Sequence, residues 1–321
     1  MENAGTYDAV VVGAGSAGLS AALMLGRARR RVLVLDGGEP RNAPASGVHY
    51  FLTRDGTPPD ELLRIGREQL EPYSGVEVRR AGATGATGSD GDFLVTLEDE
   101  STVGTRKVLL ATGVHDELPE RPGFRELWGR GSYHCPYCHG WEVRDRPLAV
   151  LNSGEDAADQ AAMIYNWSRD LFLLTDGPAK LDDEAREKLG VLGIPLIETP
   201  ISRLEGDSAS RVLYRIDFED GTELTREALF YRPPQRQRSD LAEGLGCEFE
   251  TPGPLLTVIK NDSMTRETTV PGVYVAGDAG SMLQGAIMAA ASGASAAAFI
   301  NHSLITEEGK ASGYRQQASG E

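Results

Sequence analysis

The chain has 321 residues, of which 40% are hydrophobic and 25% are charged, as is usual for a soluble globular protein long enough to form two domains. Its formal net charge of −16 argues against binding to nucleic acid, whose phosphates attract basic surfaces, and against binding to anionic membranes. The sequence shows no secretory signal and no apolar run suited to spanning a membrane, so we expect a cytoplasmic protein.

The first part of the chain predicts a β–α–β unit. Tyr7–Val12 is a short apolar run with β-branched residues, typical of a buried parallel strand. A Gly-Ala-Gly-Ser-Ala-Gly run follows at once and opens a helix that we expect from about Ser16 to Arg29. Val32–Leu35 predicts the second strand, and Asp36 stands at its end. This order of strand, glycine run, helix, strand and acidic residue is typical of a dinucleotide-binding site.

The glycines of this run each have a physical role in such a site. The first permits a tight turn, the second lets the backbone approach a pyrophosphate, and the third lets helix and strand pack closely. The helix N-terminus offers free N–H groups to the phosphates, and Asp36 can bind a pair of ribose hydroxyls. The alternative interpretation is a tight strand–helix turn that binds no ligand. The residues concerned are Gly13, Gly15, Ser16, Ala17 and Gly18.

Strands and helices continue to alternate along the chain, which predicts an α/β fold. Before a charged, proline-containing crossing at Asp116–Pro122 we expect the strand Val76–Arg79, a glycine-rich turn at Gly82–Gly91, and the strands Phe93–Glu98 and Lys107–Ala111. After the crossing we expect the strand Leu148–Leu151, the helix Ser153–Asn166, and the strands Leu171–Leu174, Pro195–Ile197 and Val212–Phe218. The strand Gly272–Ala276 and a helix of small residues within Gly285–Ile300 close the series.

Two of the three cysteines stand in the sequence His134-Cys135-Pro136-Tyr137-Cys138-His139. A dithiol at this spacing can close into a disulfide and reopen, so it can store and pass two electrons. A neighbouring imidazole can take or give the proton that thiol chemistry needs near neutral pH. A structural zinc site would need four suitably spaced ligands, so we predict no metal here. The third cysteine, Cys247, we interpret as a small core residue.

Several segments together resemble the low-molecular-weight thioredoxin reductase family. They are the N-terminal glycine run, the Ala-Thr-Gly that ends the strand Lys107–Ala111, the Gly-Val-Tyr-Val-Ala-Gly-Asp of Gly272–Asp278, and the C-x-x-C. The run Cys-Pro-Tyr-Cys-His-Gly-Trp-Glu, with Val48–Gly56, is similar to a branch that includes dithiol oxidases acting on natural products such as holomycin and gliotoxin. The resemblance implies two Rossmann-like three-layer dinucleotide-binding domains, the second inserted into the first, and a homodimer.

The resemblance also assigns the cofactor and the domain bounds. It implies an FAD-binding domain at 1–117 and 246–321, and an inserted NADPH-type domain at 118–245 that carries the C-x-x-C. In this family the aspartate that ends the motif at Gly272–Asp278, here Asp278, binds the ribityl chain of the flavin. The expected FAD contacts are Gly13, Gly15, Ser16, Ala17, Gly18, Asp36, Gly37, Arg41, Asn42, His49, Ala83, Thr112, Gly113, Gly277, Asp278, Gln284 and Ala286.

The NADPH fingerprint of the family is altered in this sequence. Its place is taken by Asn152–Ala157, where Asn152 replaces the first glycine and two carboxylates stand where pyrophosphate would approach. The basic cluster that holds the 2′-phosphate is replaced by Thr175-Asp176-Gly177, and we expect Asp176 to repel that phosphate. We therefore expect NADPH binding to be weak or absent, with an unusual but working NADPH site as the alternative.

The resemblance gives each residue of the redox pair a role. Cys138 is the thiol next to the flavin, Cys135 exchanges with substrate, His139 handles protons, and His134 assists or caps the turn. We therefore expect an FAD-dependent dithiol oxidase that passes electrons from a small-molecule or peptide dithiol to O₂. Three alternatives stay open: an NADPH-dependent reductase of thioredoxin-like partners, a disulfide reductase fed by ferredoxin or a second flavin, and a non-enzymatic FAD-containing redox sensor.

Overall fold

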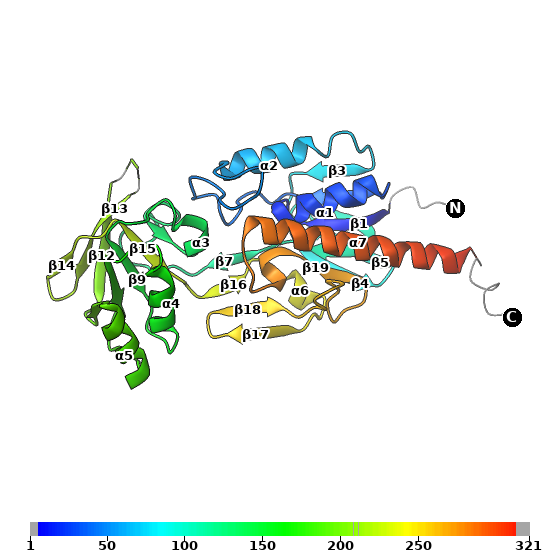
Figure 1. Ribbon diagram of the computed structural model, residues 1–321. Helices are drawn as coiled ribbons and strands as arrows, with labels where there is room; N and C mark the ends of the chain where they lie inside the picture. Colours follow the sequence, from blue (N-terminus) through cyan, green and yellow to red (C-terminus); the bar gives the residue numbers. More distant parts are fainter. Residues whose placement is uncertain (1–5, 208, 211, 313–321) are drawn as a thin grey trace. The chain divides into compact units, whose positions relative to one another are not determined.

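The computed structural model of the protein describes residues 6–207, 209–210 and 212–312. The chain forms two compact units, coloured along the sequence in Figure 1. The first unit comprises residues 6–41, 60–115 and 235–312, and the second comprises residues 42–59 and 116–234 with the gaps just given. Over these described ranges, no helix combines the length and the apolar character needed to cross a lipid bilayer.

The first unit contains a seven-stranded sheet. Its strands are β1 (Tyr7–Val12), β2 (Val32–Leu35), β3 (Val76–Arg79), β4 (Ala83–Ser89), β5 (Asp92–Leu97), β6 (Thr102–Leu110) and β19 (Val273–Val275). The order is β3-β2-β1-β6-β5-β4, and β19 also pairs with β6. The pairs among β3, β2, β1, β6 and β19 are parallel, whereas β4 and β5 are antiparallel. A four-stranded sheet in the order β17-β18-β16-β7 comprises β7 (Val114–Asp116), β16 (Gln235–Gln237), β17 (Phe249–Gly253) and β18 (Leu256–Ile259).

Small residues bring two helices of this unit into close contact. The helices of the unit are α1 (Ser16–Arg27), α2 (Pro59–Glu68), α6 (Leu241–Gly244), the 3₁₀ turn η1 (Gly277–Gly280) and α7 (Ala286–Ala311). A Cβ added to Gly293 of α7 would lie 2.0 Å from the backbone oxygen of Ala17 in α1. The buried core beneath includes Leu25, Ala297 and Leu304. The glycine therefore sets how closely α7, in red-orange in Figure 1, approaches α1.

The second unit is built on a parallel sheet with an antiparallel sheet added. The parallel strands follow the order β11-β10-β9-β15-β8: β11 (Leu196–Ile197), β10 (Leu171–Leu174), β9 (Leu148–Leu151), β15 (Ala228–Tyr231) and β8 (Ser132–Tyr133). The antiparallel sheet contains β12 (Ile201–Gly206), β13 (Leu213–Phe218) and β14 (Glu223–Leu224). The helices are α3 (Pro136–His139), α4 (Ala157–Ile164) and α5 (Asp183–Leu192).

The predicted α/β fold class is confirmed, and one predicted turn is wrong. The segment Gly82–Gly91 was expected as a turn because it holds four glycines, but Ala83–Ser89 forms β4. Antiparallel pairing with β5 satisfies its backbone, and the side chain of Ala86 is buried in the core. Gly85 falls at a register shift opposite Thr96, a position where glycine is common in strands. Long-range pairing therefore outweighed local composition.

The compact units differ from the predicted division at two places. The chain returns to the first unit at Gln235 rather than at residue 246, because Leu241 and Ala242 of α6 pack into the core beside Val10. The segment 42–59 belongs with the second unit, where a Cβ added to Gly129 would lie 2.9 Å from the carbonyl carbon of Pro44. Contacts between segments distant in the sequence, rather than sequence continuity, decide both assignments.

Candidate active site

The glycine run of the first unit forms a tight turn between β1 and α1. Gly13 has a φ of +111°, and a Cβ there would lie 2.3 Å from the backbone oxygen of Ala111. A Cβ on Gly18 would lie 1.8 Å from the backbone oxygen of Gly13. A Cβ on Gly15 would meet nothing within 4 Å. The first and third glycines are thus required by the fold, while the second leaves space beside the backbone.

The three predicted FAD motifs converge on this turn. Ala111 and Thr112 lie against Gly13, and a Cβ on Gly277 would lie 3.1 Å from the Cβ of Ala17. The backbone N–H of Gly277 donates to Ser292 of α7 over 2.8 Å. Thr112 and Gly113 follow β6 after one intervening residue, Ala111, and Gly113 takes a φ of +71°. Segments far apart in the sequence therefore meet at the start of α1.

The N-terminus of α1 fits the pyrophosphate of FAD. Gly15 caps the helix, no side chain bonds to the cap, and no acidic residue stands in the first turn. The open N–H groups and the partial positive charge of the helix end suit an anion. The Asp36 carboxylate accepts bonds from the Gly38 N–H at 2.9 Å and from Arg67 at 2.8 Å. Its remaining lone pairs suit ribose hydroxyls, and neighbouring Gly37 is open.

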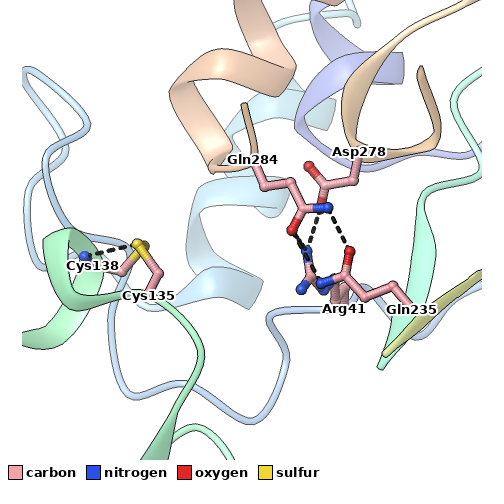
Figure 2. Close-up of a disulfide and its surroundings, with 6 residues drawn as sticks. All are labelled: Arg41, Cys135, Cys138, Gln235, Asp278 and Gln284. Carbon is pink, nitrogen blue, oxygen red and sulfur yellow. Dashed lines mark hydrogen bonds and ion pairs between the residues drawn. A yellow bond between two sulfur atoms is a disulfide. The ribbon is translucent and has the colours of Figure 1, made fainter. Parts of the chain in front are cut away.

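Four polar side chains of the first unit form a hydrogen-bonded cluster, shown in Figure 2. Arg41 donates to Asp278 over 2.8 Å and to Gln284 over 2.7 Å. Gln284 and Gln235 exchange two amide hydrogen bonds, of 2.7 and 3.2 Å. Three members were predicted from the sequence to contact FAD, and the structure brings them together. Gln235 was missed, because nothing in its local sequence links it to a residue 49 positions away.

Two further predicted cofactor contacts of this unit lie at the ends of elements. Ala83 opens β4 opposite Leu97 of β5. Ala286 opens α7, after Gly285 with a φ of +142°. Their part in FAD binding stays a prediction.

The two cysteines of the second unit form a disulfide, which Figure 2 shows at the start of α3. Their Cα atoms are 5.3 Å apart. Cys135 caps α3, Pro136 occupies the first helical position, and the Cys138 N–H points to the sulfur of Cys135 at 3.2 Å. A Cβ on Gly140 would lie 2.5 Å from the backbone oxygen of Pro136. The turn is therefore tightly held, and its N–H can stabilise a thiolate on Cys135.

His139 lies in a shielded environment beside this disulfide. Its ring stacks on Tyr133 with 4.7 Å between centroids, and its edge meets His49 at 5.7 Å. Within the described residues, both ring nitrogens are buried and have no hydrogen-bond partner. Desolvation by burial, reinforced by the nearby His49, lowers the pKa of His139 to about 4. The imidazole is therefore neutral near pH 7 and can accept a proton.

His49, predicted from the sequence to contact FAD, lies in the second unit beside His139. Its Nδ1 is 3.5 Å from Glu142 and 3.8 Å from Asp55. Asn42 also falls in this unit, where its carbonyl accepts the N–H of Ala45 at 3.0 Å. His134 lies half-buried between β8 and α3. Sequence reasoning assigned no role to Glu142 or Asp55, although both lie in segments that carry the family resemblance.

The altered nucleotide segment of the second unit is filled by its own side chains. The Asn152 side chain accepts the Gly154 N–H at 3.0 Å and donates to Asp156 at 3.0 Å and Gln160 at 2.7 Å. Asp156 caps α4 and pairs with Arg232. The backbone N–H that a pyrophosphate would use at Gly154 is thus already bonded, in contrast to the open turn of the first unit.

Asp176 has a structural role that the sequence did not predict. It pairs through both carboxylate oxygens with Arg121 and accepts the backbone N–H of Ile201 at 2.7 Å. Asp176 takes a φ of +55°, which aspartate adopts more readily than most residues. The guanidinium compensates much of its charge, so the expected repulsion of a 2′-phosphate is smaller than the sequence suggested. The loop is nevertheless occupied by this ion pair.

Comparison with known proteins places the chain in a family. Residues 7–297 match the family described as pyridine nucleotide-disulphide oxidoreductase. The chain is 33% identical to "Thioredoxin reductase sirT" of Leptosphaeria maculans, over 93% of this chain and 94% of that protein. Its structure is similar to that of HlmI, with 38% identity, a TM-score of 0.89, and 99% and 98% of the two chains covered.

A second solved structure, an oxidoreductase from Agrobacterium tumefaciens, is 34% identical with a TM-score of 0.87, and 94% and 99% of the two chains are covered. These likenesses extend over both units rather than over one motif. The family implies FAD, for which the first unit offers a fitting site, and substrates that carry a dithiol or a disulfide. The chain therefore belongs to the pyridine nucleotide-disulphide oxidoreductase family, as a flavin-dependent, thioredoxin reductase-like enzyme.

Proposed function

We propose that the protein is an FAD-dependent dithiol oxidase that forms a disulfide in a small-molecule or peptide substrate, with O₂ as electron acceptor and without NADPH. The observation that carries this proposal is the self-bonded segment at the start of α4. Asn152 takes up the Gly154 N–H, and Asp156 and Asp159 place carboxylates at the helix end where a pyrophosphate would need positive charge. A nucleotide would have to break these bonds and displace carboxylates that already pair with Arg232 and Lys188 before binding.

The residues of the second unit support a thiol–disulfide exchange. In this proposal a substrate thiol gives its proton to His139 and attacks Cys135, and Cys138 leaves as a thiolate. The second substrate thiol then displaces Cys135, so the product leaves as a disulfide and both cysteines are reduced. FAD, when bound, supplies the two-electron acceptor that reoxidises the pair and is itself reoxidised by O₂.

The second candidate is an NADPH-dependent disulfide reductase. The relative from Leptosphaeria maculans bears the name thioredoxin reductase, and two guanidinium groups are present, that of Arg232 beside the altered segment and that of Arg121 beside Asp176. Both guanidinium groups already pair with carboxylates, Asp176 and Asp156. Binding of a phosphate would therefore have to replace two formed ion pairs, which favours the oxidase.

Rapid mixing without oxygen distinguishes the two candidates. We expect a dithiol such as dithiothreitol to bleach the flavin absorbance of the purified protein rapidly, and NADPH to do so at least 100-fold more slowly. Under air, the dithiol should be consumed with formation of hydrogen peroxide. Cys135→Ser should abolish dithiol-driven bleaching while retaining bound FAD. Rapid bleaching by NADPH with little response to dithiols would refute the oxidase and select the reductase.

A further inference from the structure

The proton that His139 accepts must leave the ring, to a cysteine sulfur or to solvent, before His139 can act again. Both of its ring nitrogens are shielded, and within the described part of the chain neither has a partner. In the exchange proposed above, two substrate protons must be taken up for each substrate disulfide formed. Each must pass to a cysteine sulfur or leave to solvent, because the two electrons stay on the cysteines. A buried base that could not release its proton would stop after one transfer.

The neighbours of His139 form a series of increasing exposure that leads to the surface. The side chain of His49, which meets the His139 ring edge-on, is 17% exposed. Glu142, 3.5 Å from the Nδ1 of His49, is 35% exposed, and Asp55, at 3.8 Å, is 72% exposed. All four residues lie in the second unit. The series therefore connects a shielded imidazole to solvated carboxylates through one intervening imidazole.

We propose that His49 is a positioning residue of the thiol–disulfide reaction, which receives the proton from His139 and passes it to Glu142 and Asp55 at the surface. The inference rests on the proposed exchange at Cys135 and Cys138, though not on the electron acceptor. The imidazole ring of His49 can accept at one nitrogen and donate at the other, as a relay requires. With 5.7 Å between the ring centroids, one bridging water or a small rotation of His49 closes the gap.

The charges around the pair favour outward transfer. Glu142 and Asp55 attract the positive charge on a protonated His49, whereas a protonated His49 repels a charge on His139. Tyr133, which stacks on His139, has a pKa raised to about 12 by burial and by Glu142, so it stays neutral; Arg130 and Arg146 act on it in the opposite sense. Burial therefore disfavours a proton on His139, and the carboxylates of Glu142 and Asp55 attract positive charge towards the surface.

The alternative is that His49 only packs against His139. His49→Phe separates the two roles, because phenylalanine keeps an aromatic edge but carries no proton. The variant is prepared with FAD and mixed anaerobically with dithiothreitol. The flavin absorbance, together with free thiols at Cys135 and Cys138 counted by acid quenching and alkylation, then follows the electrons over time, because bound FAD reoxidises the pair. We expect exchange to slow at least tenfold, as for loss of a proton-transfer group. In His49→Ala, where removal of the ring leaves space, added imidazole should restore part of the rate. Glu142→Gln should give a smaller loss.

The control is His302→Phe, which alters an exposed histidine of α7 in the first unit. It should exchange at the wild-type rate. If His49→Phe does not retain FAD and a native circular dichroism spectrum, His49→Gln takes its place in the same assay. A rate within twofold of wild type, or a loss in His49→Ala that imidazole does not reverse, would overturn the inference. Failure of the wild-type protein to produce peroxide would instead contradict the proposed oxidase, since thiol counting does not depend on O₂.

Discussion

His139 shows how burial prepares a side chain for proton transfer. A solvated imidazole is partly protonated near neutral pH, and a protonated ring cannot accept a proton from a thiol. Stacking on Tyr133 removes water from the His139 ring, and its pKa falls to about 4. Nearly every molecule therefore holds this imidazole in its basic form above pH 5. The side chain is thus unprotonated without an ionic partner of its own, and the same shift makes it a weaker base than a solvated imidazole.

The same shift predicts a pH-dependent stability. The pKa of His139 is about 4 in the folded protein against 6.5 for the unperturbed group, so the unfolded chain binds more protons between these values. The free energy of unfolding is fully retained above pH 6.5 and falls as the pH drops towards 4, by up to about 3 kcal/mol. His139→Asn should lose less stability between pH 7 and 4.5 in urea titrations. If the free energy of unfolding falls equally with pH in the wild type and in His139→Asn, the lowered pKa of His139 is contradicted.

Sequence reasoning reached the residues of this site that are adjacent along the chain. Cys135, Cys138 and His139 share one turn, so their proximity follows from spacing alone. His49 was associated with FAD through a resemblance, yet its neighbour is His139, which is 90 positions further along the sequence. Only the path of the segment 42–59 through the second unit brings the two rings together. Proximity that depends on the path of a distant loop leaves no local signal in the sequence.

At the scale of elements, the contact between α1 and α7 holds the glycine turn, the predicted FAD site, in place. Gly293 lies against the backbone of Ala17, which belongs to the first turn of α1. The Gly277 N–H is bonded to Ser292, one residue earlier in α7. The helix of small residues predicted near the C-terminus therefore supports both the glycine turn before α1 and the motif that carries Asp278. The small residues of α7 allow it to approach α1 closely and do not indicate weak packing.

Adding a methyl group to Gly293, where α7 contacts α1, should destabilise the protein. In Gly293→Ala the new Cβ would lie 2.0 Å from a backbone oxygen, so α1 and α7 must separate. We expect unfolding free energy to fall by about 1–3 kcal/mol, as for overpacked sites, and FAD affinity to fall with it. Gly309→Ala, in the same helix with nothing within 4 Å, should gain up to about 1 kcal/mol. If Gly293→Ala and Gly309→Ala are equally stable in thermal unfolding, the contact between α1 and α7 is looser than described.

Among the elements, strands were easier to predict than glycine-rich segments. Buried strands such as β1 and β9 were placed correctly because short runs of apolar residues identify them. The β4 strand was not, since its glycines suggest a turn until β5 is known to lie beside it. The helix expected over Ser153–Asn166 begins only at Ala157, because Asn152 and Asp156 bond within the preceding loop. Pairing with a neighbouring strand outweighed local preference in β4, and side-chain hydrogen bonds within the loop delayed the start of α4.

At the scale of the molecule, the two units treat the same strand–turn–helix motif differently. In the first, the turn after β1 leaves the helix N-terminus open and free of acidic side chains. In the second, the turn after β9 is bonded internally by Asn152 and carries carboxylates. We therefore expect the molecule to bind a dinucleotide in the first unit only.

Hydrogen exchange can test this asymmetry. Adding FAD to the flavin-depleted protein should stabilise it by about 2.7 kcal/mol at 100 times the dissociation constant. Protection of amides should increase around residues 13–18 and 277–286, and adding NADPH should leave residues 152–160 unchanged. Protection of amides at 152–160 on adding NADPH would contradict this expectation, because it would show that a nucleotide breaks the internal hydrogen bonds of Asn152.

The polypeptide enters the second unit twice, first over residues 42–59 and again over residues 116–234. A chimera that exchanged only the longer stretch with a related enzyme would transplant the sulfur pair and His139 but leave His49 behind. Even when such a chimera folds, its His139 would lie beside the other enzyme's residue at the position of His49. Recombination, in the laboratory or in evolution, therefore transfers the disulfide together with both histidines only when residues 42–59 and 116–234 are exchanged together.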